Sequence, residues 1–270
     1  MRIGFVGAGN MAQAIIGGLL NTGTSADEIS IYEPSQALAE RLVASQGIRA
    51  AVSNVELFEQ CDVIVLAVKP QVMKSALESV RGARLKENAF VLSIAAGIPI
   101  ASIQDWLGAD HPVVRVMPNT PVLVGAGVSG LYASDQTRND QREAAESILR
   151  AVGSVVWLES EALIDSVAAV SGCGPAYFFY FIEALERAAL ENGLSAEQAR
   201  LLSLETAFGA SKLALESSVS AAELRTRVTS PGGMTEAALK VFDAQALSDT
   251  VKAAVRASVL RGRELAETTD

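Results

Sequence analysis

Residues 1–12 read MRIGFVGAGNMA, in which an apolar strand runs directly into a glycine-rich turn and then into a helical pattern. This is the dinucleotide-binding pattern G-x-G-x-x-G/A in its strand–turn–helix context. Gly7 permits the tight turn, Gly9 leaves room for a pyrophosphate, and the small Ala12 lets the helix approach the sheet. The helix N-terminus offers N–H groups and a partial positive charge to the phosphates. We therefore expect a bound dinucleotide rather than a purely structural glycine turn.

Strand-like and helical patterns alternate through the first half of the chain. Such alternation predicts parallel βαβ units with right-handed crossovers, and therefore a Rossmann domain with a doubly wound, mostly parallel sheet over residues 1–158. The strands are expected at Arg2–Val6, Ile29–Tyr32, Asp62–Ala67, Ala89–Ile94, Pro112–Met117, Gly127–Ala133 and Val155–Leu158. Helices are expected between several of them, at Met11–Asn21, Ser35–Gln46 and Val72–Val80.

The second half changes character and reads as helix almost throughout, from Glu161 to Glu267. The spacings Ser195 to Gln198 and Ser220 to Glu223 are typical of capping boxes at helix starts. Breaks are expected at Gly172–Pro175, Gly193 and Ser230–Gly233. The sequence thus predicts an α/β N-terminal domain followed by an all-α C-terminal domain over residues 159–270.

Composition excludes several classes of protein. The 270 residues carry a formal charge of −9, which argues against non-specific nucleic-acid binding. No apolar run of about 18 residues predicts a membrane span, and the N-terminus begins a strand rather than a signal peptide. Cys61 and Cys173 form neither a disulfide framework nor a metal-ligand pattern. We expect a cytoplasmic protein without metal, nucleic-acid or membrane partners.

The end of the second expected strand bears on the choice between NADH and NADPH. It reads Tyr32-Glu33-Pro34-Ser35, and an acid at Glu33 can accept a hydrogen bond from a ribose 2′-hydroxyl and repel a 2′-phosphate. Ser35 can instead donate to a 2′-phosphate, although no arginine stands beside it. A solvated acid and a helix-capping serine explain the same residues, so the preference stays open.

Five further loops identify a family. Three follow expected strands, where doubly wound sheets bind ligands: Ala67-Val68-Lys69-Pro70, Ser93-Ile94-Ala95-Ala96-Gly97 and Val116-Met117-Pro118-Asn119-Thr120-Pro121. Two lie in the helical half: Ser171-Gly172-Cys173-Gly174-Pro175-Ala176-Tyr177 and Ser230-Pro231-Gly232-Gly233-Met234-Thr235. Together they resemble the pyrroline-5-carboxylate reductase family of proline biosynthesis, over essentially the whole chain.

The resemblance implies an NAD(P)H-dependent oxidoreductase that acts on a CH–NH group and reduces 1-pyrroline-5-carboxylate to L-proline. It implies NADPH as cofactor, with NADH as the alternative, held by Gly7, Ala8, Gly9, Asn10, Met11, Ser35, Asn54, Ala67, Val68, Lys69, Pro70, Ala95 and Ala96. It implies substrate contacts from Gly172, Cys173, Ser230, Gly232, Gly233, Met234 and Thr235. The Thr235 hydroxyl is expected to hydrogen-bond the ring nitrogen and is the expected catalytic group.

The backbone chemistry of the loop at residues 230–235 agrees with this role. Pro231 fixes its φ angle, and Gly232 and Gly233 permit conformations closed to other residues. The following helix points free N–H groups back at the loop, which makes a carboxylate site without arginine. A plain helix-starting turn is the alternative. The chain departs from the family at Cys173, normally serine, and over residues 220–226, from which no contact is transferred.

Three other side chains are candidates for a role in binding or proton transfer. His111 precedes an expected strand and is better explained as a loop residue, while Lys69 is either a ligand contact or a solvated lysine. Lys212 invites comparison with hydroxyacid dehydrogenases, which use a helical lysine, but their G-x-x-G-x-x-x-K pattern is absent. A related hydroxyacid, carbonyl or cyclic-imine reductase and a non-catalytic NADP(H) sensor are the alternative functions.

The helical half has broad apolar faces, which include Leu201, Leu204, Phe208, Leu213 and Leu215. Such faces need to be buried. The resemblance implies an intertwined homodimer or larger homo-oligomer, with helices of both chains around each active site. A self-contained helical cap is the alternative.

Overall fold

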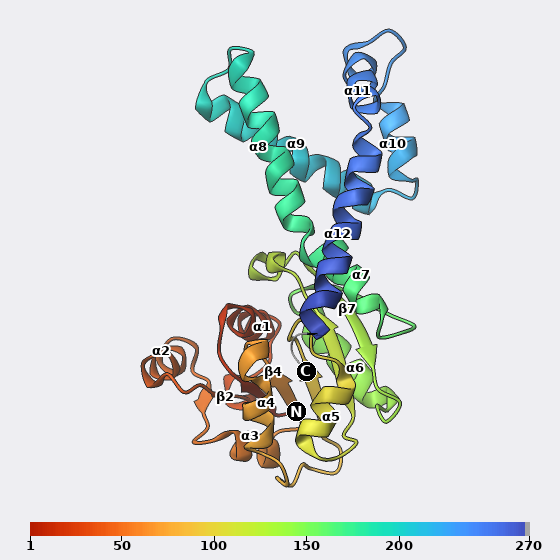
Figure 1. The fold of residues 1–270 in the computed structure, drawn as a ribbon. Helices are drawn as coiled ribbons and strands as arrows, with labels where there is room; N and C mark the ends of the chain where they lie inside the picture. Colours follow the sequence, from red (N-terminus) through yellow and green to blue (C-terminus); the bar gives the residue numbers. More distant parts are fainter. Residues whose placement is uncertain (268–270) are drawn as a thin grey trace. The chain divides into compact units, whose positions relative to one another are not determined.

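The computed structural model describes residues 1–267, with side chains to residue 264. The chain forms two compact units (Figure 1). Unit 1 comprises residues 1–173 together with the C-terminal segment from residue 258, and unit 2 comprises residues 174–257. The sequence predicts a boundary at residue 158 between a cofactor-binding and a substrate-binding domain. The two compact units are defined by contacts within the chain and do not test this boundary, which stays a prediction.

Unit 1 is built on an eight-stranded sheet in the order β3-β2-β1-β4-β5-β6-β7-β8. All neighbouring strands are parallel except the antiparallel pair β6 and β7. This confirms the predicted fold class. The strands are β1 (Ile3–Val6), β2 (Ile29–Tyr32), β3 (Arg49–Ala50), β4 (Val63–Leu66), β5 (Phe90–Ser93), β6 (Val113–Met117), β7 (Gly127–Ala133) and β8 (Gly153–Trp157). The short edge strand β3 was not predicted.

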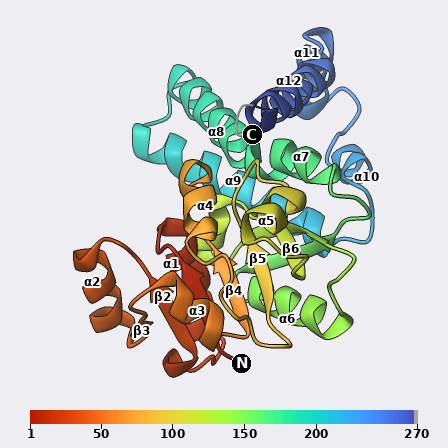
Figure 2. The same cartoon turned by 60° about the horizontal axis from the view of Figure 1, so that its bottom comes forward.

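Helices cover both faces of this sheet, which is why its central strands are continuous apolar runs (Figure 2). One face packs against α1 (Asn10–Asn21), α2 (Gln36–Gln46), α6 (Asn139–Arg150) and the short 3₁₀ helix η2 (Thr120–Val124). The other face packs against α3 (Asn54–Gln60), α4 (Pro70–Glu78) and α5 (Ile100–Leu107). A second 3₁₀ helix, η1 (Ala26–Glu28), precedes β2.

The strand register brings the predicted cofactor loops to one edge of the sheet. Val6 lies opposite both Tyr32 and Leu66, and Leu66 lies opposite Ser93. These four residues end β1, β2, β4 and β5, so the loops that follow them meet at the carboxyl edge. This edge is where open α/β sheets bind their ligands.

The predicted break at Gly172–Pro175 is not a loop. The short helix α7 (Leu163–Val167) continues through a π-helical segment, η3 (Ala168–Gly172), into α8 (Gly174–Glu191). The Cys173 N–H donates to the Ala168 carbonyl over 2.8 Å, which widens the turn by one residue. Because α7 packs on β6 and β7, this segment belongs to unit 1 although it reads as helix in the sequence.

Unit 2 is helical, as predicted, and contains α8, α9 (Ala196–Glu216), α10 (Ala221–Arg227), α11 (Met234–Ala244) and the first part of α12 (Leu247–Glu267). The capping box of Ser195 and Gln198 is confirmed, with both reciprocal bonds present. A break that the sequence did not predict separates α11 from α12 at Ala246, whose φ is +53°.

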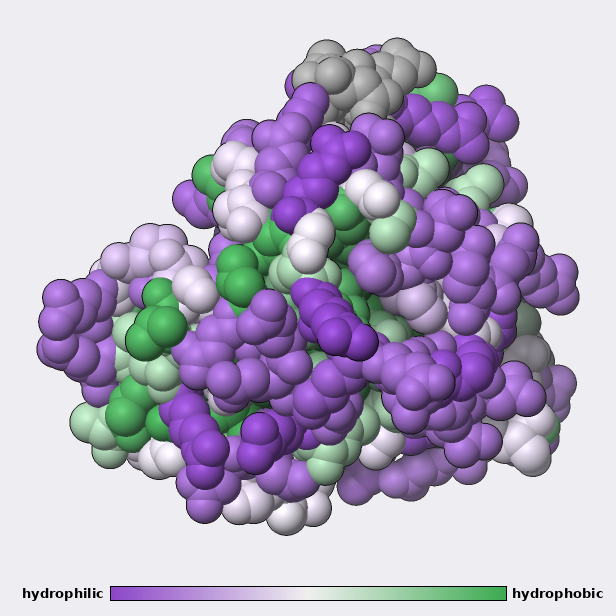
Figure 3. Space-filling model, turned by 90° about the horizontal axis from the view of Figure 1, so that it is seen from below, coloured by the Kyte–Doolittle hydropathy of each residue, from purple (hydrophilic) through white to green (hydrophobic). Residues whose placement is uncertain are grey.

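Unit 2 has almost no core of its own. Among its apolar side chains only Ala199 is buried, and the rings of Phe181 and Phe242 lie 6.3 Å apart. Large apolar side chains are exposed along α8 and α9, including Phe179 and Phe208. The view from below in Figure 3 differs from these helices in its surface. Hydrophilic residues cover most of that face, with apolar residues in small groups between them.

By length and composition alone, the helical stretch Leu163–Glu191 is apolar enough to cross a membrane. This differs from the expectation that no apolar run reaches the length of a membrane span. The stretch also contains charged side chains, among them Asp165, Glu183 and Arg187, and the last two form an ion pair.

Candidate functional site

The glycine loop between β1 and α1 is held tightly against β2 and β4. The Gly7 N–H donates to the Tyr32 carbonyl over 2.9 Å, and the φ of Gly7 is +89°. A Cβ atom at Gly7 would lie 2.8 Å from Val68 Cγ1 and 3.1 Å from the Ala67 carbonyl oxygen. Gly7 is therefore required both for its backbone conformation and for the close approach of the loop after β4.

Gly9 serves a different purpose, because it faces open space. A Cβ atom there would meet nothing within 4 Å, so packing does not explain this glycine. Gly9 is the N-cap of α1, no side chain caps that helix, and no acidic residue occupies its first turn. An uncapped helix N-terminus below open space fits a bound pyrophosphate.

The other predicted cofactor residues lie along the same edge of the sheet. Ser35 is the N-cap of α2, and its hydroxyl makes no capping bond. Asn54 begins α3, and its buried Oδ1 has no hydrogen-bond partner in the part of the chain that the structure describes. Lys69 precedes α4 and is exposed, and Ala95 and Ala96 follow β5. An orphaned amide oxygen and a free hydroxyl both fit the polar groups of a dinucleotide.

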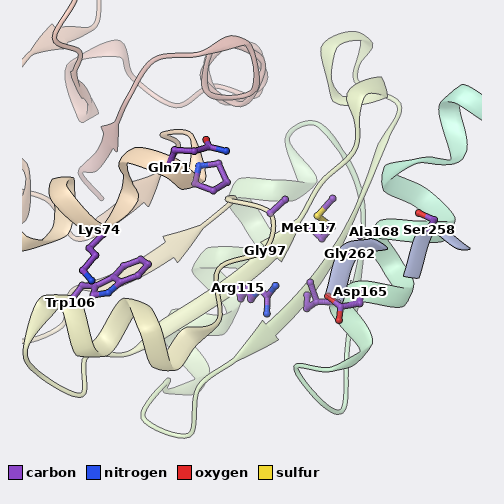
Figure 4. A pocket seen from close by; sticks show the side chains of 13 residues that line it. Gln71, Lys74, Gly97, Trp106, Arg115, Met117, Asp165, Ala168, Ser258 and Gly262 are labelled. Carbon is purple, nitrogen blue, oxygen red and sulfur yellow. The ribbon is translucent and has the colours of Figure 1, made fainter. Parts of the chain in front are cut away.

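A cavity of about 540 Å³ opens beside this edge, within unit 1 (Figure 4). Two predicted cofactor residues, Pro70 and Ala96, contribute to its wall. In Figure 4, Arg115 lies between Trp106 and Asp165, below Gly97. The remaining lining residues are Gln71, Lys74, Trp106, Met117, Ile164, Ala168, Ser258 and Gly262.

Arg115 is a functional candidate that the sequence analysis missed. Its side chain is buried, and its Nη1 donates to Glu161 Oε1 over 2.8 Å. The same oxygen accepts the N–H of Ile100 at the start of α5, while Arg115 Nε has no partner among the described residues. The sequence signal that could have indicated Arg115 is its place as a single charged residue within the apolar strand β6. Glu161 therefore ties Arg115, which lines the cavity, to the start of α5.

Asn119, in the loop that follows β6, is a second residue that was not predicted as part of the site. Its Nδ2 donates to the Ser171 carbonyl over 3.1 Å, and its Oδ1 accepts the Val128 N–H over 2.9 Å. A Cβ atom at Gly172 would lie 2.9 Å from the Met117 methyl carbon, so the π-helical segment sits directly on the end of β6. Asn119 therefore positions the backbone around Gly172.

The predicted substrate residue Cys173 follows the π-helical segment. Its Sγ lies 3.3 Å from Ser258 Oγ on α12, within hydrogen-bond distance for sulfur. The thiol thus has a local polar partner, although S–H is a weak donor compared with a hydroxyl.

The loop Ser230–Thr235 belongs to unit 2 and begins α11. Gly232 has a φ of +72°, and the Gly233 N–H donates to the Ser230 carbonyl over 3.0 Å. Gly233 is the N-cap, and no side chain caps the helix. The first N–H groups of α11 are therefore free to bind an anion, as predicted from the sequence pattern. The exposed Thr235 hydroxyl has no hydrogen-bond partner among the described residues.

One feature of this loop was not predicted. The Gly232 N–H donates to Glu236 Oε2 over 2.9 Å, and Glu236 also lies 3.3 Å from Lys240 Nζ. A carboxylate of the chain itself thus occupies one N–H group of the loop. The loop is chemically suited to carboxylates, since it already binds one.

The remaining candidates lie elsewhere. His111 precedes β6 at the amino edge of the sheet, and burial lowers its pKa although Asp110 raises it. Lys212 lies 3.9 Å from Glu216 on the same helix. Burial raises the pKa of the Cys61 thiol to about 11, so it is not a nucleophile. No metal-binding group of His, Cys, Asp and Glu is present among the described residues.

Comparisons with known proteins cover the whole chain. The family model for pyrroline-5-carboxylate reductase dimerisation matches residues 161–265, and that for coenzyme F420-dependent NADP oxidoreductases matches residues 2–97. A pyrroline-5-carboxylate reductase of Pseudomonas aeruginosa is 48% identical over 98% of this chain and 97% of its own length. One of Vibrio alginolyticus is 40% identical over 98% of this chain and 97% of its own length.

Solved structures agree with the sequence relatives. A pyrroline-5-carboxylate reductase of Coxiella burnetii has a TM-score of 0.94 and 41% identity, covering 98% of each chain. A pyrroline carboxylate reductase of Plasmodium falciparum, solved with NADP bound, has a TM-score of 0.85 and 30% identity over 98% of each chain.

Proposed function

The chain belongs to the pyrroline-5-carboxylate reductase family, and we propose that it reduces 1-pyrroline-5-carboxylate to L-proline with NADPH or NADH. The observation that carries this proposal is the pair of uncapped helix N-termini, at Gly9 and at Gly233, each preceded by a glycine loop. The first fits a dinucleotide pyrophosphate and the second fits a small carboxylate. A reductase of a cyclic imino acid needs both.

The cofactor residues proposed from the sequence lie on unit 1. Gly7 to Met11 hold the pyrophosphate at the start of α1, and Ser35 and Asn54 bind the adenosine half. The segment Ala67–Pro70, with Ala95 and Ala96, leads to the cavity of Figure 4. The nicotinamide end would lie in this cavity. When bound, the reduced nicotinamide supplies a hydride.

The substrate residues bind and orient the imine. The free N–H groups at the start of α11 hold its carboxylate, with Ser230, Gly232, Gly233 and Met234 shaping the loop. The Thr235 hydroxyl hydrogen-bonds the ring nitrogen, as donor to the neutral imine and as acceptor from the N–H of the iminium that forms when this nitrogen takes a proton from water. An iminium carbon is already electrophilic, so positioning and one polar contact suffice, and no strong general base is required. Gly172 and Cys173 complete the substrate contacts.

We further propose that the protein acts as a cytoplasmic homodimer or larger homo-oligomer. The support is the match of residues 161–265 to a dimerisation model, together with the exposed apolar side chains of α8 and α9. A second copy of the chain would remove these side chains from water. The same burial accounts for the apolar stretch Leu163–Glu191 without a membrane.

A spectrophotometric assay tests the function. The purified full-length protein is given 1-pyrroline-5-carboxylate with NADPH or NADH, and loss of nicotinamide absorbance is followed together with L-proline formation. We expect stoichiometric oxidation and proline formation with at least one cofactor. Dinucleotide binding without turnover would reject the proposal and favour a sensor, whereas turnover only with a 2-oxo acid would favour a hydroxyacid reductase.

A further inference from the structure

The end of β2 holds a carboxylate at the mouth of the glycine loop. Glu33 Oε2 accepts the Ala8 N–H over 3.1 Å, and Glu33 Oε1 accepts the Ser35 N–H over 3.0 Å. Each oxygen therefore has its own backbone donor, and the half-buried carboxylate is fixed between the cofactor loop and the start of α2. This is the place where a Rossmann fold receives the adenosine ribose of its dinucleotide.

The surroundings contain little positive charge to accept a phosphate. The first basic residue of α2 is the exposed Arg41, six residues after Ser35. Arg49, on the neighbouring strand β3, lies 3.3 Å from Asp27 and is paired with it. The start of α2 offers the Ser35 hydroxyl, but the Ser35 N–H is already bound to Glu33. A 2′-phosphate here would meet the fixed negative charge of Glu33.

We propose that Glu33 makes this enzyme prefer NADH over NADPH, and this proposal rests on the function proposed above. The carboxylate accepts the 2′-hydroxyl of the adenosine ribose in NADH, which is a charge-assisted hydrogen bond. In NADPH the same position carries a phosphate of about two negative charges, which Glu33 repels. Both cofactors support turnover, and NADH does so more efficiently.

Two measurements on the full-length enzyme test the preference. The first compares kcat/KM for NADH and NADPH at saturating imine, and we expect a ratio of at least about 10 in favour of NADH, a factor that one charge contact commonly supplies. The second compares the affinities of ADP-ribose and 2′-phospho-ADP-ribose, which carry the discriminating group but no nicotinamide. We expect ADP-ribose to bind more tightly by a similar factor.

The variant Glu33→Gln removes the charge and keeps the shape. We expect it to lower the NADH-to-NADPH ratio about tenfold, mainly by improving NADPH, with a salt dependence smaller than that of the parent enzyme. Glu33→Ser serves as a second variant, and Glu40→Gln, an exposed acid on α2, is the control that leaves the ratio unchanged.

The two assays separate the outcomes. Preferential ADP-ribose binding without imine turnover would reject the proposed function and support the role of Glu33. Turnover that favours NADPH, with tighter binding of 2′-phospho-ADP-ribose, would overturn the role of Glu33 and leave the function intact. An unchanged cofactor ratio in both Glu33 variants would also overturn it.

Discussion

The two glycine loops use the same local chemistry on very different supports. Each precedes a helix whose N-cap is glycine, and in each a backbone N–H binds a carboxylate of the chain: Ala8 binds Glu33, and Gly232 binds Glu236. The first loop rests on a buried sheet, through Gly7 and Tyr32. The second rests on residues of its own turn, in a unit whose only buried apolar side chain is Ala199.

This difference teaches that the two ligands depend on the protein in different ways. The proposed dinucleotide residues all lie on unit 1, which has two buried hydrophobic clusters of its own. The proposed carboxylate loop lies on unit 2, whose large apolar side chains are exposed. We therefore expect oligomerisation to govern turnover more strongly than it governs dinucleotide affinity.

The largest expected effect comes from charging the apolar face of unit 2. In the double variant Phe179→Asp with Phe208→Asp, two aromatic side chains that are 66% and 65% exposed become acidic. We expect dissociation to monomers and a loss of turnover of at least about 100-fold, because central aromatic residues dominate interfaces. ADP-ribose affinity should change less than about twofold, since a surface change leaves the cofactor loop intact.

Molar mass in solution, turnover and ADP-ribose binding are measured on the same preparation. Val124→Asp is the matched control, because this apolar side chain of unit 1 is 80% exposed and is not one of the proposed cofactor residues. Equal losses of ADP-ribose binding and turnover would contradict the expectation, because they would show that the cofactor loop depends on oligomerisation as strongly as the second loop does.

Removing the Thr235 hydroxyl tests the chemistry of the second loop. We expect Thr235→Ala to lower kcat roughly 10- to 100-fold, the scale of one lost polar contact in a transition state, with dinucleotide affinity unchanged. Thr250→Ala is the control, because that exposed hydroxyl donates to the Ala246 carbonyl over 3.2 Å. Steady-state kinetics with a normal kcat would remove Thr235 from the mechanism.

A smaller effect is expected from the internal carboxylate of the second loop. Glu236→Gln keeps an oxygen acceptor for the Gly232 N–H but removes a charge that competes with the substrate carboxylate. We expect the KM for the imine to fall about two- to fivefold at low ionic strength, and the difference to shrink as salt is added. Glu216→Gln, on α9, is the control, and a raised KM would mean that Glu236 shapes the loop more than it repels the substrate.

The smallest effect concerns the stability of unit 1. Burial lowers the pKa of folded His111 below its ordinary value of 6.5. At a pH between the lowered pKa of folded His111 and 6.5, the unfolded chain carries a proton on this residue that the folded chain lacks. The contribution of His111 to the free energy of unfolding is therefore full above about pH 6.5 and falls as the pH falls. His111→Gln should flatten the dependence of the unfolding midpoint on pH between about 7 and 5. If the midpoint of the variant depends on pH as steeply as that of the parent protein, other groups cause the dependence.

Much of the first unit was predictable because its strands are buried on both faces. Runs such as Val63–Leu66 have no polar interruption, and their glycine turns are local signals. The two-residue strand β3 has no such signal, since both of its residues are exposed. The π-helical segment depends on Asn119 and Met117, which are distant in sequence, and therefore could not be read from its own residues.

The second unit was predictable as helix but less so in its details. The capping box at Ser195 is a local pattern, and it was found. The helical stretch breaks at Ala246, whose φ is positive, and residues 234–257 around it contain no glycine or proline that marks the break. The Arg115–Glu161 pair joins a strand to the segment before α7, and only the fold brings the two together.

Unit 1 is not contiguous in sequence, and this sets an order for its assembly during translation. All eight strands precede residue 158, so the sheet can form while the helices of unit 2 are still being made. Ser258 and Gly262, which line the cavity of Figure 4, leave the ribosome only after every residue of unit 2. The nascent chain therefore has a finished sheet before it has a finished cavity wall, and the late docking of α12 links completion of the cavity to synthesis of the second unit.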